Sequence, residues 1–175
     1  MHDRIKKPGP NGRLPLNLGF FGGFLDFTIV GGPFDAYRPG PDDFGVCVRA
    51  ERAPDTADLR LGITDFGVPA PSRKGEVDEA IRRTLEAAMT GQRVYVGCMG
   101  GWGRTGMFLA LLAKVCGEEM PVMYVRHHYT PRAVETTEQA RYVTEFDVSE
   151  LRRWLFWRSW TIRWTKVLFW WDVPL

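Results

Sequence analysis

One segment in the middle of the chain constrains the fold more than any other. Arg93 to Val96 is a short β-branched and aromatic run, which predicts a buried strand. A glycine-rich loop (residues 97–106) follows at once, and Met107 to Cys116 is apolar on nearly every side, which predicts a central buried helix. Ahead of the strand, apolar residues recur every four positions over 76–90 and predict an amphipathic helix. This order indicates an α/β fold, a small central sheet flanked by helices.

The segments on either side add strands first and helices later. Alternating apolar residues predict strands over 44–48 and 59–63, and a further short strand is expected over 25–30. Beyond the buried helix, Pro121 is expected to open a helix, and Thr136 to Gln139 has the form of a capping box that begins another. The second half is therefore predicted to be mainly helical.

Composition indicates one compact unit of 175 residues, which we divide into three parts. Residues 1–43 form a glycine- and proline-rich segment expected to pack on the domain, 44–150 the core, and 151–175 a tryptophan-rich basic segment, here called the Trp-rich segment. The balance of 23 Lys and Arg against 21 Asp and Glu creates no strong positive field, which disfavours nucleic acid as a partner.

The three cysteines, Cys47, Cys98 and Cys116, are too few and too widely spaced for a disulfide scaffold or a zinc cluster. They indicate a reducing compartment, and we expect a cytoplasmic protein without metal or cofactor. No apolar run approaches the roughly 18 residues of a membrane-spanning helix. Asn17 and Asp26 interrupt the apolar zone after the basic N-terminus, which disfavours a signal peptide.

The glycine-rich loop combines a nucleophile with an anion cradle. Closely spaced glycines allow backbone N–H groups to point at one centre, and the helix that follows adds the positive end of its dipole. Cys98 stands at the start of the loop and Arg104 six positions later. The amides, the dipole and Arg104 all favour a thiolate at Cys98. Arg104 presents a fork suited to two phosphoryl oxygens, and Thr105 offers a hydroxyl close to the sulfur.

This segment resembles the signature of the cysteine-dependent protein tyrosine phosphatase superfamily: Cys, five residues, Arg, then Ser or Thr. Cys98, Arg104 and Thr105 match it in order and spacing. The resemblance implies a phosphatase of the tyrosine or dual-specificity type. The residues that would bind phosphate are Met99, Gly100, Gly101, Trp102, Gly103 and Arg104. A glycine-rich turn around a buried structural cysteine is the alternative.

Two more segments support the resemblance. Ile63 to Pro69 looks like the mobile acid loop of classical tyrosine phosphatases, which implies that Asp65 is the general acid. A turn aspartate is the alternative. The stretch from Arg132 to Val143 is similar to the start of the last core helix in dual-specificity phosphatases, where Gln139 would orient the hydrolytic water. Gln139 would otherwise serve only as the capping-box partner of Thr136.

The chain departs from the family pattern at three positions. Glu135 stands where classical tyrosine phosphatases carry a glutamine, Gly97 where the family usually has histidine, and Thr64 where the classical enzymes have proline. None of these changes removes a reacting atom, so activity is expected. The loop also lacks the lysines of phosphoinositide-directed members, which disfavours an inositol lipid. Arg126, His127 and His128 are expected to be solvated and not to contact substrate. Cys47 is expected to be a buried strand cysteine and not a redox partner of Cys98.

The resemblance implies two-step hydrolysis of a phosphate monoester, with phosphorylated protein as the expected substrate. An RNA 5′-phosphatase and a catalytically silent phosphate-binding module are the alternatives. The Trp-rich segment leaves three functions open: packing on its own domain, contact with a partner or a second copy, and contact with a membrane surface. Its tryptophans are Trp154, Trp157, Trp160, Trp164, Trp170 and Trp171.

Overall fold

The computed structural model describes residues 11–18 and 26–169, with side chains described as far as Ile162. A five-stranded sheet runs in the order β1-β2-β5-β3-β4. Its strands are β1 (Gly12–Asn17), β2 (Asp26–Pro33), β3 (Asp43–Cys47), β4 (Leu59–Arg60) and β5 (Arg93–Cys98). Only β1 is antiparallel to its neighbour, and β5 lies at the centre between β2 and β3. The chain is therefore α/β with a mixed sheet flanked by helices, as predicted.

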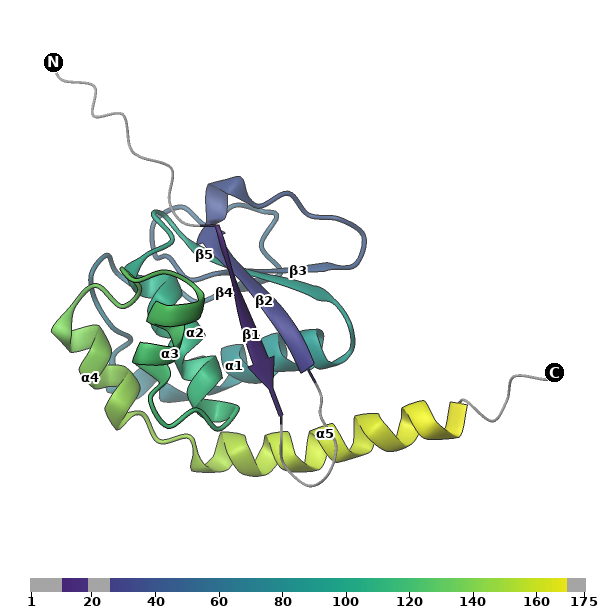
Figure 1. Ribbon diagram of the computed structural model, residues 1–175. Helices are drawn as coiled ribbons and strands as arrows, with labels where there is room; N and C mark the ends of the chain where they lie inside the picture. The colour runs from purple at the N-terminus through teal and green to yellow at the C-terminus, as the bar shows by residue number, and fades with distance from the viewer. Residues whose placement is uncertain (1–10, 19–25, 170–175) are drawn as a thin grey trace, which may run out of the picture.

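The helices pack on one face of the sheet. They are α1 (Lys74–Met89), α2 (Gly103–Val115), α3 (Pro121–His128), α4 (Thr137–Glu145) and α5 (Ser149–Phe169). Side chains alternate along each strand, so Val94 and Val96 of β5 face the helices while Tyr95 faces the other way. That second face is covered by Phe34 and Tyr37 from the short turn η1 (Phe34–Ala36), and Figure 1 shows α2, α3 and α4 grouped together beside the strands.

The predicted helices and their ends follow from local sequence. Helix α1 buries the four-residue repeat of Val77, Ile81 and Leu85, and Gly91 after it takes a φ of +96°, the left-handed conformation that ends a helix. Helix α2 is buried on all sides. The α4 capping box is present, because Thr136 and Gln139 bond to each other's backbone N–H groups.

The N-terminal segment forms two short strands, which agrees with the one or two strands expected there. It supplies two strands, β1 and β2, so the sheet includes residues on both sides of the boundary drawn at position 43. The strand expected over 25–30 runs from Asp26 to Pro33, and β1 carries Leu14 and Leu16 into the core despite the glycines and prolines around them. The edge strand β1 pairs with the next strand in the chain, β2, and β2 pairs in turn with the distant β5.

The strand predicted over 59–63 is shorter than expected, since only Leu59 and Arg60 pair as β4. Beyond them, the Leu61 amide donates to the Cys47 carbonyl at 2.9 Å and the Ile63 carbonyl accepts from Ala50 at 3.0 Å. These bonds keep the chain extended up to Ile63. They place the residues that follow beside the carboxyl end of β3.

Helix α5 accounts for the first part of the Trp-rich segment. Leu151, Leu155 and Ile162 are buried, and Arg158 forms an ion pair with Glu86 of α1. Trp157 and Trp160 are 60% and 52% exposed, so packing on the domain uses a different face of α5 from the one that carries these two tryptophans. The side chains of Trp164, Trp170 and Trp171 lie outside the described residues. Among the described helices none is long and apolar enough to cross a membrane.

Candidate active site

The end of β5 and the start of α2 build the nucleophile's surroundings. Cys98 closes the strand and α2 begins at Gly103, so the loop turns within four residues. The Gly101 N–H donates to the Cys98 sulfur at 3.2 Å, and the Cys98 N–H donates to the Thr105 hydroxyl oxygen at 2.8 Å. Cys98 is only 3% exposed. The sulfur is therefore enclosed by the loop, with one backbone N–H directed at it and the N-terminus of α2 beside it.

Gly101 requires a glycine for two reasons. Its φ is +78°, and a Cβ there would lie 2.7 Å from the carbonyl carbon of Gly32. The Gly101 carbonyl in turn accepts a hydrogen bond from the buried Tyr129 hydroxyl at 2.5 Å. Burial raises the pKa of Tyr129 far above its usual value, so this hydroxyl keeps its proton and remains a donor. Tyr129, which the sequence analysis did not single out, fixes the loop from behind.

Arg104 is held at the loop by acceptors from two distant segments. Its guanidinium is almost completely buried, and Nη1 donates to both Glu51 carboxylate oxygens, at 2.6 and 2.8 Å, and to the Ile63 carbonyl at 3.0 Å. Nη2 lies 2.8 Å from Asp65 Oδ1. The Nη1 side of the guanidinium is thus held in place by Glu51 and Ile63, whereas Nη2 contacts the exposed Asp65 side chain.

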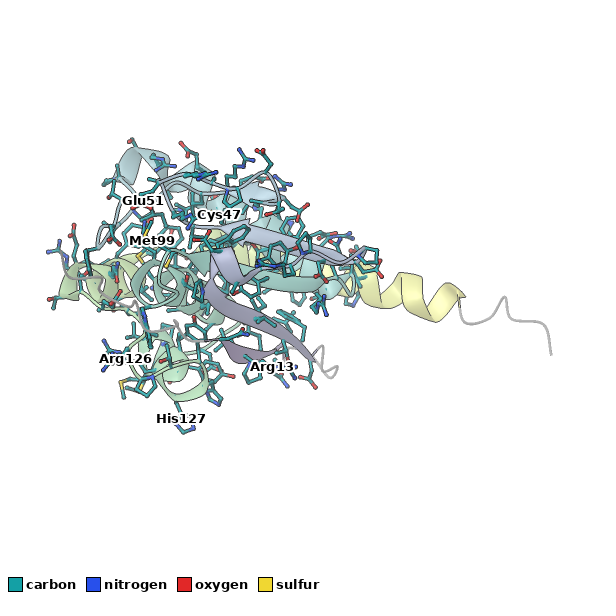
Figure 2. All side chains as sticks on the ribbon, turned by 90° about the horizontal axis from the view of Figure 1, so that it is seen from above. Arg13, Cys47, Glu51, Met99, Arg126 and His127 are labelled. Atoms are coloured by element: carbon teal, nitrogen blue, oxygen red, sulfur yellow. The ribbon has the colours of Figure 1, made fainter. Side chains whose placement is uncertain are left out.

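Glu51 is the residue that sequence reasoning missed. It lies in the loop after β3, and partial burial acts to raise its pKa. The hydrogen bonds and charge of Arg104 outweigh that effect, so the pKa of Glu51 falls below its usual value. No local motif marks this glutamate, because its partner is 53 positions away. Figure 2 shows it close to Met99 of the glycine-rich loop.

Asp65 lies at the predicted place beside the loop. Its side chain is 59% exposed while in contact with Arg104, and its Oδ1 also accepts from the Phe66 N–H at 3.2 Å. Phe66 takes a φ of +57°, an uncommon conformation for a bulky residue, and is itself 58% exposed. Backbone strain of this kind clusters at functional sites. The structure therefore brings Cys98, Arg104 and Asp65 together.

Gln139 is buried, and its amide group is engaged in the protein. Its oxygen accepts from the Glu135 N–H at 3.0 Å and from the Thr136 N–H at 3.4 Å, and its nitrogen donates to the Gly67 carbonyl at 3.4 Å. The capping role considered from the sequence is confirmed by this geometry. The water-orienting role stays a prediction.

Glu135 and Gln139 both reach the glycine-rich loop at Gly103. A Cβ on Gly103 would lie 2.6 Å from Glu135 Oε2, so glycine at 103 makes room for this carboxylate. Val134, just before it, has a φ of +61°, which is strained for a β-branched residue. Arg126 fixes this turn by donating to the carbonyls of Ala133 and Val134, each at 3.0 Å. Arg126 thus positions a loop instead of lining the cleft.

The other predicted residues lie at the edge of the glycine-rich loop or away from it on α3. Met99 is 40% exposed, and Arg132 stacks 5.6 Å from the centre of the Trp102 ring. Gly100 lies beside the same ring, since a Cβ on it would meet Trp102 at 3.1 Å. His127 and His128 meet edge to face, with ring centroids 4.7 Å apart, on the exposed side of α3. Among the described residues no cluster of three or more His, Cys, Asp or Glu could hold a metal ion.

The two remaining cysteines are buried thiols. Burial raises the pKa of Cys47, and it raises that of Cys116 to about 12. Both are therefore protonated near neutrality.

Two proteins of similar sequence are known over half of this chain. No family model matches the chain. Two uncharacterized proteins of Methanocaldococcus jannaschii, MJECL20 and MJ0215, are 39% and 36% identical over 88 residues, which is 50% of this chain in each case. The chain spans 58% and 54% of the length of these two relatives.

Two solved structures are similar over most of the chain. Kinase associated phosphatase, with its catalytic-site cysteine substituted by serine, aligns with 80% of this chain and 96% of its own at a TM-score of 0.56 and 19% identity. A mutant form of Tk-PTP aligns with 74% of this chain and 93% of its own at a TM-score of 0.52 and 21% identity. The chain has the fold of the protein tyrosine and dual-specificity phosphatases.

Proposed function

We propose that this chain hydrolyses phosphate monoesters through a cysteinyl-phosphate intermediate on Cys98, acting on phosphotyrosine or on phosphotyrosine, phosphoserine and phosphothreonine in proteins. One observation carries the proposal. At the carboxyl end of β5, a buried sulfur accepts a backbone N–H, while Arg104 lies in the same loop and contacts Asp65 at 2.8 Å. A nucleophile, a phosphate clamp and an acid thus meet where open α/β sheets bind ligands.

In the first step the Cys98 thiolate attacks phosphorus. The sulfur–phosphorus bond forms as the ester phosphorus–oxygen bond breaks, and Asp65 gives its proton to the leaving oxygen. The loop amides and Arg104 hold the negative charge of the transition state. Because Nη1 is fixed by Glu51 and Ile63, the phosphoryl group takes Nη2 from Asp65. When the phosphoryl group binds, Asp65 is released from Arg104 and can reach the leaving oxygen.

In the second step water attacks the same phosphorus, and the sulfur–phosphorus bond breaks. The water proton passes to the Asp65 carboxylate left by the first step, and phosphate departs. Gln139 and Glu135 are the two side chains that reach the start of α2 at Gly103, and we assign the holding of the water to this pair. Gln139 also fixes the Glu135 backbone through its amide oxygen.

Hydrolysis of an aryl phosphate in EDTA tests the proposal. We expect turnover by the wild type, none by Cys98→Ser, and a loss of 10²–10⁴-fold in Asp65→Asn, the usual contribution of a general acid. Cys116→Ser is the matched control, because it exchanges a buried thiol in the same core without touching the loop. A wild type that binds phosphopeptides without hydrolysing any ester would identify a phosphate-binding module instead.

A further inference from the structure

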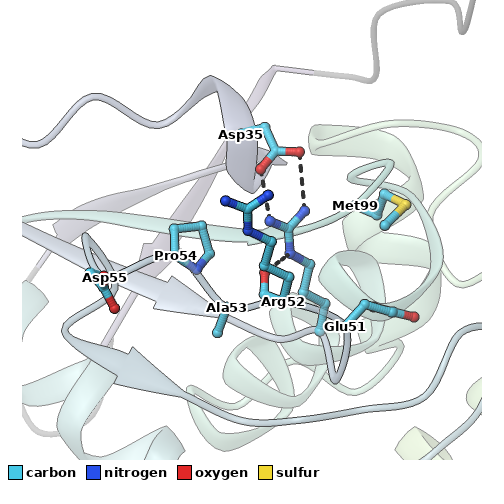
Figure 3. A pocket seen from close by; sticks show the side chains of 8 residues that line it. Asp35, Glu51, Arg52, Ala53, Pro54, Asp55 and Met99 are labelled. Atoms are coloured by element: carbon cyan, nitrogen blue, oxygen red, sulfur yellow. Dashed lines mark hydrogen bonds and ion pairs between the residues drawn. The ribbon is translucent and has the colours of Figure 1, made fainter.

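A hollow of about 580 Å³ opens next to the active site. It lies among η1, the loop after β3 and the glycine-rich loop, and two of its lining residues, Glu51 and Met99, also border the active site. Figure 3 shows Arg52 in the middle of this hollow, with Glu51 and Met99 to one side and Asp55 to the other. The lining residues are Asp35, Arg49, Glu51, Arg52, Ala53, Pro54, Asp55 and Met99.

Most of the charges around the hollow are already paired. Arg49 is 5% exposed and forms a two-point pair with Asp35, at 2.7 and 3.2 Å. Glu51 is paired with Arg104, and Asp55 with Arg60 at 3.1 Å. Of the two arginines in the lining, these pairs leave one cation without an ion-pair partner among the described residues.

That cation is Arg52. In the described part of the chain no carboxylate lies within ion-pair distance of its guanidinium, and its side chain is exposed to the hollow. Its backbone is nevertheless fixed, because its carbonyl accepts from Arg49 Nε at 3.1 Å. The buried Arg49–Asp35 pair therefore holds the loop that presents Arg52.

We propose that this hollow binds a second anionic group of the substrate, a carboxylate or a further phosphate, with Arg52 as the residue that recognises it. The inference rests on the proposed function, since the first anion is the phosphate ester at Arg104. A guanidinium fork suits either anion. The preferred substrate class is then a phosphorylated protein site with an acidic or phosphorylated neighbour.

The test uses three phosphotyrosine peptides of one length on the full chain, with alanine, glutamate or phosphoserine flanking the phosphotyrosine. Binding is measured in the Cys98→Ser background, so that no turnover is needed, and kcat and KM are measured with Cys98 intact. Arg52→Gln is compared with Arg13→Gln, which removes the same charge from exposed β1, far from Met99 (Figure 2). Melting temperatures confirm that both variants fold.

We expect the parent to bind the glutamate and phosphoserine peptides about fivefold or more tightly than the alanine peptide, as a charge-assisted contact at a partly open site allows. Arg52→Gln abolishes this preference through KM with kcat unchanged, added salt weakens it, and Arg13→Gln retains it. The two acidic peptides separate the carboxylate from the phosphate as the source. An unaltered preference in Arg52→Gln, or an equal loss in both variants, overturns the inference. An inert wild type that still shows the binding preference overturns the proposed function alone.

Discussion

Replacing Glu51 by glutamine probes how the phosphate clamp is held. The substitution keeps an oxygen facing Arg104 Nη1 but removes the charge that now accepts at 2.6 and 2.8 Å. Hydrogen bonds to charged groups contribute about 1.5–3 kcal/mol. Since Glu51 is 39% exposed whereas Arg104 is 3% exposed, solvent screening places the loss near the lower end of that range, at about 1.5 kcal/mol.

An effect of this size lowers kcat/KM for an aryl phosphate about tenfold. The pKa of Glu51 is held below its usual 4.5, so its carboxylate stays charged, and its contribution is complete, above that pH. The contribution disappears as pH falls through the lowered pKa. The ratio of wild-type to Glu51→Gln activity is therefore constant between about pH 5 and 8 and shrinks as the pH falls through the lowered pKa of Glu51.

Steady-state kinetics across this pH range provide the measurement. Glu86→Gln is the control, because Glu86 is 33% exposed, pairs with Arg158 and lies away from the loop. It is expected to leave kcat/KM unchanged. A loss smaller than twofold in Glu51→Gln, or an equal loss in Glu86→Gln, would refute the idea that Glu51 positions Arg104.

Three more substitutions test separate parts of the account. Gly97→Ala puts a Cβ 2.8 Å from backbone atoms of Phe34 and should cost about 1–3 kcal/mol of unfolding free energy in urea; an unchanged midpoint would contradict this. Tyr129→Phe removes the donor to Gly101 and should cost about 1–2 kcal/mol in the same assay, whereas a neutral effect would show that the bond does not stabilise the loop. Glu135→Gln should slow breakdown of the intermediate more than its formation, so that a burst of aryl alcohol precedes a slower steady rate; equal slowing of both steps would remove Glu135 from the water step.

Local sequence predicted the elements that carry the nucleophile. The repeat at Val77, Ile81 and Leu85 marked α1, and the order of strand, glycines and apolar helix placed Cys98 at the carboxyl end of a central strand. Asp65, predicted 33 residues before Cys98, contacts Arg104 as a residue at the edge of the same site must. The helices and the strand depend on neighbours in the sequence, so the sequence reveals them, whereas Asp65 was identified through the resemblance of its segment to a known acid loop.

The supporting residues depend on contacts between distant segments. Glu51 meets Arg104 only because β3 and β5 are adjacent in the sheet, and Tyr129 reaches Gly101 only because α3 packs on α2. The fold also explains one departure from the family pattern. Gly97 crosses so close to the backbone of Gly32 and Phe34 that a histidine side chain has no room there.

Trapping the covalent intermediate shows whether Cys98 is the nucleophile. The protein is mixed with an aryl phosphate, quenched in acid within the first turnover, digested and analysed by mass spectrometry, with Cys98→Ser and Cys116→Ser in parallel. The account predicts one added phosphoryl group on the peptide that carries Cys98, in the wild type and in Cys116→Ser, and none in Cys98→Ser. Turnover without any phosphoryl group on that peptide, or phosphorylation that persists in Cys98→Ser, would contradict it.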